Sequence, residues 1–172
     1  MVEAPRPYDG PTETDRALAQ QVYRTIVEYE PLRATRPELH VWAENGHIRL
    51  GGRMRTLAMK EISEYRAHLL DGQGVRAIRN DVVADPEVVR AVAIALASDD
   101  RLASARIRVD VRDGEVVLAG GLPDGAAIER ARELAMGVPG AAGVDSHLLT
   151  PASGPEVAAN GAVGRVAMQE GR

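Results

Sequence analysis

Two similar stretches of sequence decide the fold: VWAENGHIRLGG at residues 41–52 and VDVRDGEVVLAG at residues 109–120. In each stretch, apolar and polar residues alternate on both sides of an Asn-Gly or Asp-Gly pair. Alternation is typical of a half-buried strand, and these dipeptides are the preferred two-residue hairpin turns because both turn positions need a positive φ. Each stretch is therefore predicted to form a β-hairpin.

The sequence on either side of the hairpins repeats as well. Within the hairpins three positions recur 68 residues apart, namely Gly46 and Gly114, Leu50 and Leu118, and Gly52 and Gly120. Upstream, at a spacing of 70, Leu18, Val22, Ile26 and Leu32 match Val88, Val92, Leu96 and Leu102. Downstream, at a spacing of 66, Ile62, Arg66, Gly74 and Ile78 match Ile128, Arg132, Gly140 and Val144. Both changes in spacing fall where loops are expected, which indicates two copies of one fold.

Each copy is predicted to run helix, hairpin, helix, strand. In the second copy Asp85 is expected to cap the first helix, with Pro86 at its first position. In the first copy Thr12 or Thr14 is expected to cap it. The remaining elements are a second helix at 57–70 or 126–136 and a last strand at 78–83 or 144–149.

The predicted fold class is α+β, with two tandem αββαβ domains at residues 14–84 and 85–150. Each would have a small three-stranded sheet with two helices on one face, because each amphipathic helix must bury its apolar stripe. The other face of each sheet would then be free. We expect residues 1–13 and 151–172 to be disordered tails.

Composition excludes several classes of function. The chain of 172 residues has no cysteine, so disulfides, thiolate catalysis and Cys-rich zinc sites are excluded. The net charge of −4 disfavours non-specific nucleic-acid binding by the whole molecule. The four histidines lack ligand spacing, and no residue set suggests a catalytic or metal site, so we expect no enzyme activity and no cofactor.

We expect the protein to be cytoplasmic, a location that is compatible with peripheral attachment to a membrane. No apolar run is long enough for a transmembrane helix. The first ten residues, MVEAPRPYDG, lack the apolar core of a secretory signal.

The candidate binding site lies in the first copy. Residues 15–84 carry 11 basic and 9 acidic side chains, whereas residues 85–150 carry 7 and 11. Between Asn45 and Lys60 there is no acidic residue, and apolar side chains are interleaved with the cations. The candidate residues are Trp42, Arg49, Arg53, Met54, Arg55, Leu57, Met59 and Lys60. Such a segment suits an anionic lipid surface, to which each cation contributes on the order of 1 kcal/mol. The alternative is that the apolar residues cap the core and the arginines are merely solvated.

Trp42 is the only tryptophan of the chain and is predicted to point away from the core. An exposed tryptophan on a sheet face often marks a contact, either with an external partner or with the other domain. The glycines are interpreted as turn residues, since neither phosphate-loop pattern occurs: Gly46, Gly52, Gly74, Gly114, Gly120 and Gly140.

The order of elements, the V-x-V-x-[DN]-G-x-V-x-L-x-G hairpin at residues 109–120 and the G-V-P-G-A-A-G-V-D-S stretch at residues 137–146 resemble the BON domain family. The first copy matches at residues 45–52 and at 74–80, and departs from the pattern at Trp42 and His47. The resemblance implies a non-enzymatic bacterial domain that attaches to phospholipid surfaces or partner proteins, often in envelope or osmotic-stress contexts.

Three functions remain open at this point. The first is an adaptor that docks on an anionic phospholipid surface or an envelope-associated protein through the first copy. The second is a protein-binding or self-assembling module with Trp42 at its interface, of unspecified oligomeric state. The third is a potassium-responsive domain, a function that the resemblance implies through one branch of the BON domain family.

Overall fold

The computed structural model describes residues 11–151. The expected tails, 1–13 and 151–172, therefore lie almost wholly outside the described residues, although the first helix already begins at Glu13. The described elements, in chain order, are α1 (Glu13–Val27), α2 (Glu30–Thr35), β1 (Glu38–Glu44), β2 (His47–Met54), α3 (Leu57–His68), β3 (Ala77–Asn80), β4 (Val83–Ala84), α4 (Asp85–Ala97), β5 (Ile107–Arg112), β6 (Glu115–Gly121), α5 (Gly125–Met136) and β7 (Gly143–Leu149).

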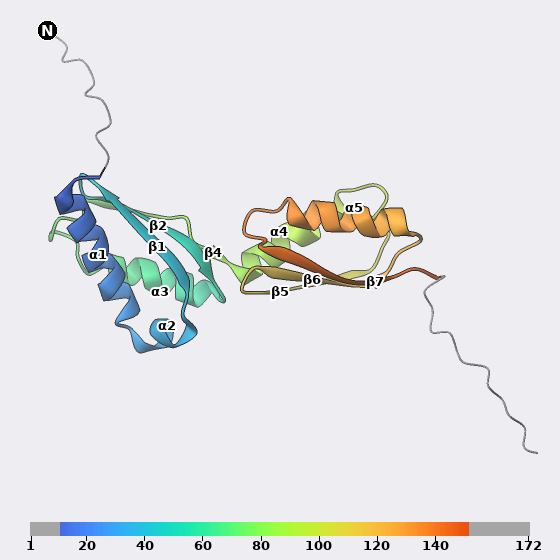
Figure 1. Ribbon diagram of the computed structural model, residues 1–172, viewed down its shortest axis with the longest axis horizontal. Helices are drawn as coiled ribbons and strands as arrows, with labels where there is room; N and C mark the ends of the chain where they lie inside the picture. The colour runs from blue at the N-terminus through green and yellow to red at the C-terminus, as the bar shows by residue number, and fades with distance from the viewer. Residues whose placement is uncertain (1–10, 152–172) are drawn as a thin grey trace, which may run out of the picture.

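These elements form two mixed α/β units, here called the first unit (residues 11–84) and the second unit (residues 85–151), which follow one another along the molecule (Figure 1). The first sheet has the order β1-β2-β3 and the second the order β5-β6-β7. In both, the hairpin strands pair antiparallel and the last strand pairs parallel to the second hairpin strand. The two sheets thus share one topology.

The hairpin turns have the predicted backbone geometry. Asn45 and Gly46 have φ of 50° and 80°, and Asp113 and Gly114 have 52° and 82°. Positive φ at both positions matches the twist of the flanking strands. The β1–β2 pairing then places Trp42 directly opposite Arg49.

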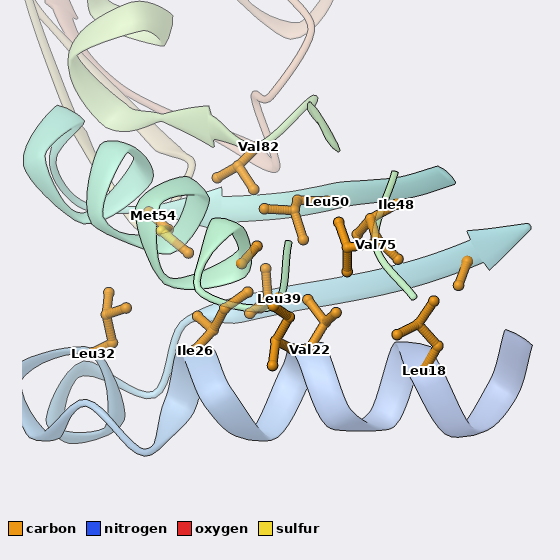
Figure 2. Packing of buried hydrophobic residues seen from close by; sticks show 13 residues of the cluster. Leu18, Val22, Ile26, Leu32, Leu39, Ile48, Leu50, Met54, Val75 and Val82 are labelled. Carbon is orange, nitrogen blue, oxygen red and sulfur yellow. The ribbon is translucent and has the colours of Figure 1, made fainter. Parts of the chain in front are cut away.

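A separate core holds each unit together. In the first unit, α1 buries Leu18, Val22 and Ile26 against the helix-facing side of the sheet, which contributes Leu39 and Leu50 (Figure 2). The second unit buries the matched positions of α4 against its own sheet. Fully burying one such side chain stabilises the fold by about 1.5–3 kcal/mol, so the helical stripe read from the sequence is the main source of cohesion.

All six turn glycines have a positive φ, between 80° and 147°. Gly52 and Gly120 also allow a close approach of backbones, because a Cβ at Gly52 would lie 1.8 Å from the carbonyl oxygen of Glu38 and one at Gly120 would lie 2.4 Å from that of Arg106. Any side chain at these two positions would force β2 or β6 away from its hairpin partner.

One buried carboxylate in each unit ties the start of the first helix to the hairpin turn. Asp15 completes a capping box with Thr12, and its Oδ1 accepts the N–H of Asn45 at 2.8 Å. The hydrogen bond from the Thr12 hydroxyl is the main cause that holds the pKa of Asp15 below its ordinary value. In the second unit, Asp85 accepts the N–H groups of Asp113 and Gly114 at 2.8 and 3.1 Å.

Asp85 was expected to cap α4, and this was wrong. The N-cap position is Ala84, whose N–H is accepted by Glu87 at 2.9 Å, while the Asp85 side chain turns to the hairpin. Instead of capping the helix, the Asp85 carboxylate accepts two backbone N–H groups of the hairpin turn.

The first unit departs in two further ways from the expected three strands and two helices. The short helix α2 follows α1, begins next to Pro31 and buries Leu32. The last strand is split into β3 and β4, which both pair with β2. The ladder is interrupted because the Asn80 side chain accepts a hydrogen bond from the N–H of Val82 at 3.2 Å. The chain passes from β4 into α4 with no intervening residue.

We predict that Asp85→Ala lowers the free energy of unfolding by about 1–3 kcal/mol, because it leaves two backbone N–H groups at a buried site without their acceptor. Urea denaturation followed by circular dichroism measures this loss. The matched control is Asp100→Ala, an exposed aspartate whose loss should change stability by less than about 0.5 kcal/mol. Equal losses in both variants would contradict the assigned role.

Candidate binding surface

The free face of the first sheet carries the exposed aromatic ring of Trp42, of which 53% is accessible. The Arg49 guanidinium lies 5.6 Å from the centre of the Trp42 ring, and the centre of the His40 ring lies 5.8 Å from it. Gly51 leaves room for this arrangement, since a Cβ there would lie 2.8 Å from the ring. A cation over an aromatic face is attracted by the ring quadrupole, so Arg49 holds the ring in a defined orientation.

A row of charges continues from Trp42 across the sheet. Arg49 lies between Trp42 on β1 and Arg79 on β3 in the strand register. Asp81 joins the two arginines, accepting from Arg49 Nε at 2.7 Å and from Arg79 Nε at 2.8 Å. The hydrogen bond from Arg79 is the main cause that lowers the pKa of Asp81, and the same bond raises the pKa of Arg79.

The free face is close to neutral. Arg53 pairs with Glu38, its Nε donating at 2.9 Å, and the pKa of Glu38 is lowered mainly by that bond. His40 lies 3.6 Å from Glu38. The arginines keep exposed edges, 63% for Arg49 and 76% for Arg79, but each already has an acidic partner. An incoming anion would have to compete with these carboxylates.

The structure does not bring the eight candidate residues together on one surface. Trp42, Arg49 and Arg53 lie on the free face, whereas Met54, at the end of β2, is 3% exposed and belongs to the core. Met54 is therefore unable to insert into a membrane or partner, which corrects the expectation from sequence. The alternation of β2 explains this position, because Met54 shares the inward side with Leu50.

Of the four remaining candidates, Leu57 and Met59 lie on α3, while Arg55 and Lys60 contact the second unit. Leu57, at the start of α3, is 45% exposed, while Met59 packs partly against the first core. Arg55 pairs with Asp113 through two bonds of 2.7 and 2.8 Å. Lys60 pairs with both carboxylate oxygens of Glu87 at 2.9 Å.

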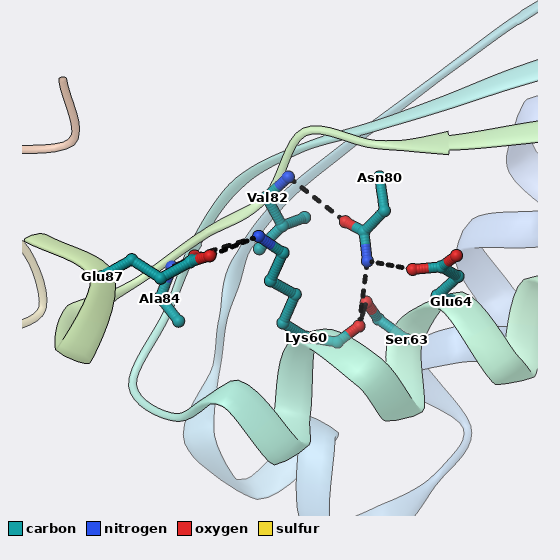
Figure 3. Close-up of polar contacts among 7 residues, drawn as sticks. All are labelled: Lys60, Ser63, Glu64, Asn80, Val82, Ala84 and Glu87. Atoms are coloured by element: carbon teal, nitrogen blue, oxygen red, sulfur yellow. Dashed lines mark hydrogen bonds and ion pairs between the residues drawn. The ribbon is translucent and has the colours of Figure 1, made fainter.

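Arg55 and Lys60 thus join the two units. Figure 3 shows Lys60 reaching from α3 to Glu87 on α4, next to the Asn80 side chain that shapes the β3–β4 break. Val83 completes the joint by packing against the core of the second unit. Both cations pair with acidic residues of the second unit, so binding to a lipid surface would require these ion pairs to break.

Sequence reasoning missed Arg79 and Asp81 as members of the site. The strand register that places Arg79 beside Arg49 depends on the parallel pairing of β2 with β3, which is not visible in a single sequence. The same register creates a depression of about 660 Å³ at the hairpin end of the first unit, whose lining includes Trp42, Arg49 and Arg79.

Two further findings concern the described residues. Between residues 11 and 151, no group of three or more His, Cys, Asp or Glu side chains is placed to hold a metal ion. Within the same range, no helix is long and apolar enough to cross a membrane.

Comparisons with known proteins find one family model that is similar to the second unit. Residues 84–151 match the model of the BON domain. No curated protein matches the chain. Solved structures with a similar fold include two of CdsD, a structural protein of the type III secretion system of Chlamydia trachomatis, one of them of its C-terminal domain.

The likeness to CdsD extends over both units but is distant in sequence. The C-terminal domain structure is 17% identical with a TM-score of 0.54, covering 79% of this chain and 66% of that chain. The other is 16% identical with a TM-score of 0.56, covering 78% of this chain and 62% of that chain. The chain therefore spans slightly less than two thirds of each of these structures, and the likeness establishes the fold.

We predict that the Lys60–Glu87 pair stabilises the protein by about 0.5–1 kcal/mol at neutral pH, because it is partly buried and doubly bonded. Burial raises the pKa of the Glu87 carboxyl, but the N–H of Ala84 and the Lys60 ammonium outweigh it, so the pKa lies below the ordinary 4.5. This stabilisation is present above the ordinary pKa and disappears as the pH falls through the folded-state pKa. Urea denaturation of Lys60→Met, Glu87→Gln and the double variant measures the coupling at about pH 7 and about pH 3.

The coupling should fall toward zero at the lower pH. The exposed Arg132–Glu129 pair, whose charged atoms are 3.5 Å apart on α5, is the control and should show little coupling at either pH. A Lys60–Glu87 coupling that is unchanged by acid would mean that the contact does not depend on the Glu87 charge.

Proposed function

We propose that this protein is a non-catalytic binding module built from two BON-like domains, residues 14–84 and 85–150, and that it binds a protein partner through the free face of the first domain. The partner would cover the Trp42 ring and present acidic groups to the exposed edges of Arg49 and Arg79. The observation that carries the proposal is Trp42, fixed in orientation by Arg49 yet 53% accessible.

The equivalence of the two domains is supported by contacts that match pair by pair. Asp15 and Asp85 accept backbone N–H groups of their hairpin turns. The carbonyl of Gly46 accepts the N–H of Arg76 at 2.8 Å, just as that of Gly114 accepts the N–H of Ala142 at 2.8 Å. The family match to the second domain therefore supports a BON-like assignment of the first.

A protein partner is favoured over an anionic phospholipid surface by the state of the cations. Arg49 and Arg53 are paired on the free face, and Arg55 and Lys60 are paired with the second unit. Lipid headgroups are recognised by clusters of unpaired basic residues, whereas protein contacts are typically centred on tryptophan, tyrosine and arginine. That CdsD is a structural protein of a secretion system agrees with a role in protein contacts.

The single tryptophan allows a direct test, because its fluorescence reports on the proposed surface alone. We predict that anionic phosphatidylglycerol vesicles leave the emission of the full chain unchanged at low salt. A photo-activatable cross-linker placed at position 40 should instead capture a protein from the host cell, and Trp42→Ala should reduce that capture by more than about tenfold, as expected for a central contact residue.

Tyr65→Ala is the matched control. Tyr65 is 66% exposed on α3, away from the free face, so its removal should leave capture unchanged. A blue shift with anionic vesicles that salt or Arg49→Glu abolishes would replace the protein partner with a lipid surface. Equal capture by the wild type and Trp42→Ala would show that the free face is not the binding surface.

A further inference from the structure

The edge strand of the first sheet has an open side. Among the described strands, β1 pairs with β2 alone. In a two-residue hairpin the pair next to the turn, here Glu44 and His47, exchanges both backbone hydrogen bonds, and such pairs alternate along the ladder. Val41 and Ala43 therefore direct their N–H and C=O groups away from β2, and no other described residue pairs with these groups. They are free to bind the backbone of one further strand.

A groove runs along this open side, between α1 and β1, which pack against each other (Figure 1). Two depressions of about 660 and 280 Å³ share Ala19 of α1 and Val41 of β1 in their lining, so they form one groove, here called the α1–β1 groove. Tyr23, which is 42% exposed, forms a wall of the smaller depression. The middle of the groove is therefore lined by apolar groups.

An arginine lies toward each end of the α1–β1 groove. Arg16 lines the larger depression and Arg24 the smaller one. Both are exposed, and neither guanidinium has an ion pair or hydrogen bond with another described residue. Of the acidic residues in the lining, Asp15 already accepts hydrogen bonds from the helix cap and the hairpin turn, and Glu44 lies on the free side of β1. The groove thus combines an apolar middle with an unpaired cation at either end.

We propose that the partner contributes an extended segment that pairs with the open side of β1 and carries acidic residues at positions i and i+4 with an apolar residue at i+2. Arg16 and Arg24 are eight residues apart on α1, about 12 Å along the helix, and four residues of a strand span about 13 Å. Alternate residues of a strand point to one side, so the side chains at i, i+2 and i+4 all face the groove. The acidic ones reach the two arginines, and the apolar one packs between them on Ala19, Tyr23 and Val41.

This inference rests on the proposed function, because Trp42 belongs to the same strand. The residues of the added segment at i+1 and i+3 lie on the free side of the extended sheet, next to the Trp42 ring. In such strand addition the backbone hydrogen bonds supply affinity, and the sites for alternate side chains supply selectivity. The open side of β1 and the charges of the groove therefore specify the class of partner that the free face alone leaves undefined.

Selection from a library of short random peptides displayed on phage, with the full chain as bait, tests the inference. The recovered peptides should share acidic residues four positions apart with an apolar residue midway. The double variant Arg16→Glu, Arg24→Glu should select basic residues at those two positions and should bind the wild-type peptides on the order of tenfold more weakly. Recovery of peptides without this spacing, or of the same peptides by the wild type and the double variant, would overturn the inference.

The matched control is Arg108→Glu, which reverses the charge of an exposed arginine on the edge strand of the second unit. It should change neither the selected sequences nor their affinity, and circular dichroism checks that every variant is folded. Sedimentation velocity of the chain without peptide checks the competing occupant. Self-association that the double variant abolishes would assign the groove to a second copy of the chain instead of a partner segment.

Amide hydrogen exchange followed by NMR tests the strand pairing itself. A selected peptide should slow the exchange of the Val41 and Ala43 N–H groups on the order of tenfold or more, because both gain an acceptor. The N–H of Trp42 already bonds within the hairpin and should change little. Unchanged exchange at Val41 and Ala43 in the presence of a bound peptide would show that the peptide does not extend the sheet.

The inference and the proposed function fail in different ways. If Trp42→Ala loses capture from position 40 while the double variant at Arg16 and Arg24 keeps it, the free face remains the binding surface and the groove does not take part. If selected peptides protect Val41 and Ala43 but bind Trp42→Ala as tightly as the wild type, the groove remains a peptide site and the Trp42 surface is not needed for it.

Discussion

The contact between a buried carboxylate and the hairpin turn is the constraint on which the rest of the structure depends. Asp85 binds two backbone N–H groups of the Asp113-Gly114 turn, and Asp15 binds the matching turn of the first unit. A left-handed turn exposes N–H groups that the hairpin ladder does not satisfy, and buried donors must be paired. By meeting this need, the carboxylate fixes the helix start against the end of the sheet. This contact fixes the position of the helix's apolar stripe relative to the strands of the hairpin.

The direct passage from β4 to α4 extends that constraint to the whole molecule. Asp85 belongs at once to the chain segment that leaves the first sheet and to the turn contact of the second unit. With no linker residue, the last strand of one unit and the first helix of the next are positioned by the same few residues. The ion pairs of Arg55 and Lys60 close the joint on two sides. This explains why the most basic stretch of the sequence does not form a basic surface.

The sequence predicted the parts that depend on local periodicity and turn chemistry. The Asn-Gly and Asp-Gly turns, the buried stripe of α1 and α4, and the order of elements follow from such patterns. Contacts between residues far apart in the sequence were out of reach: a single chain does not reveal that Asp113 would pair with Arg55, or that Arg79 would come to lie beside Arg49. The cationic segment was therefore read as one surface, although its residues divide between a sheet face, a core and a joint.

Comparison of the two units shows where each has specialised. Their cores and turn contacts are matched, but the first unit places its aromatic group on the sheet face, while the second exposes Ile94 on α4. Surface positions away from the core contribute little to folding, so the two units can differ there and still keep one fold.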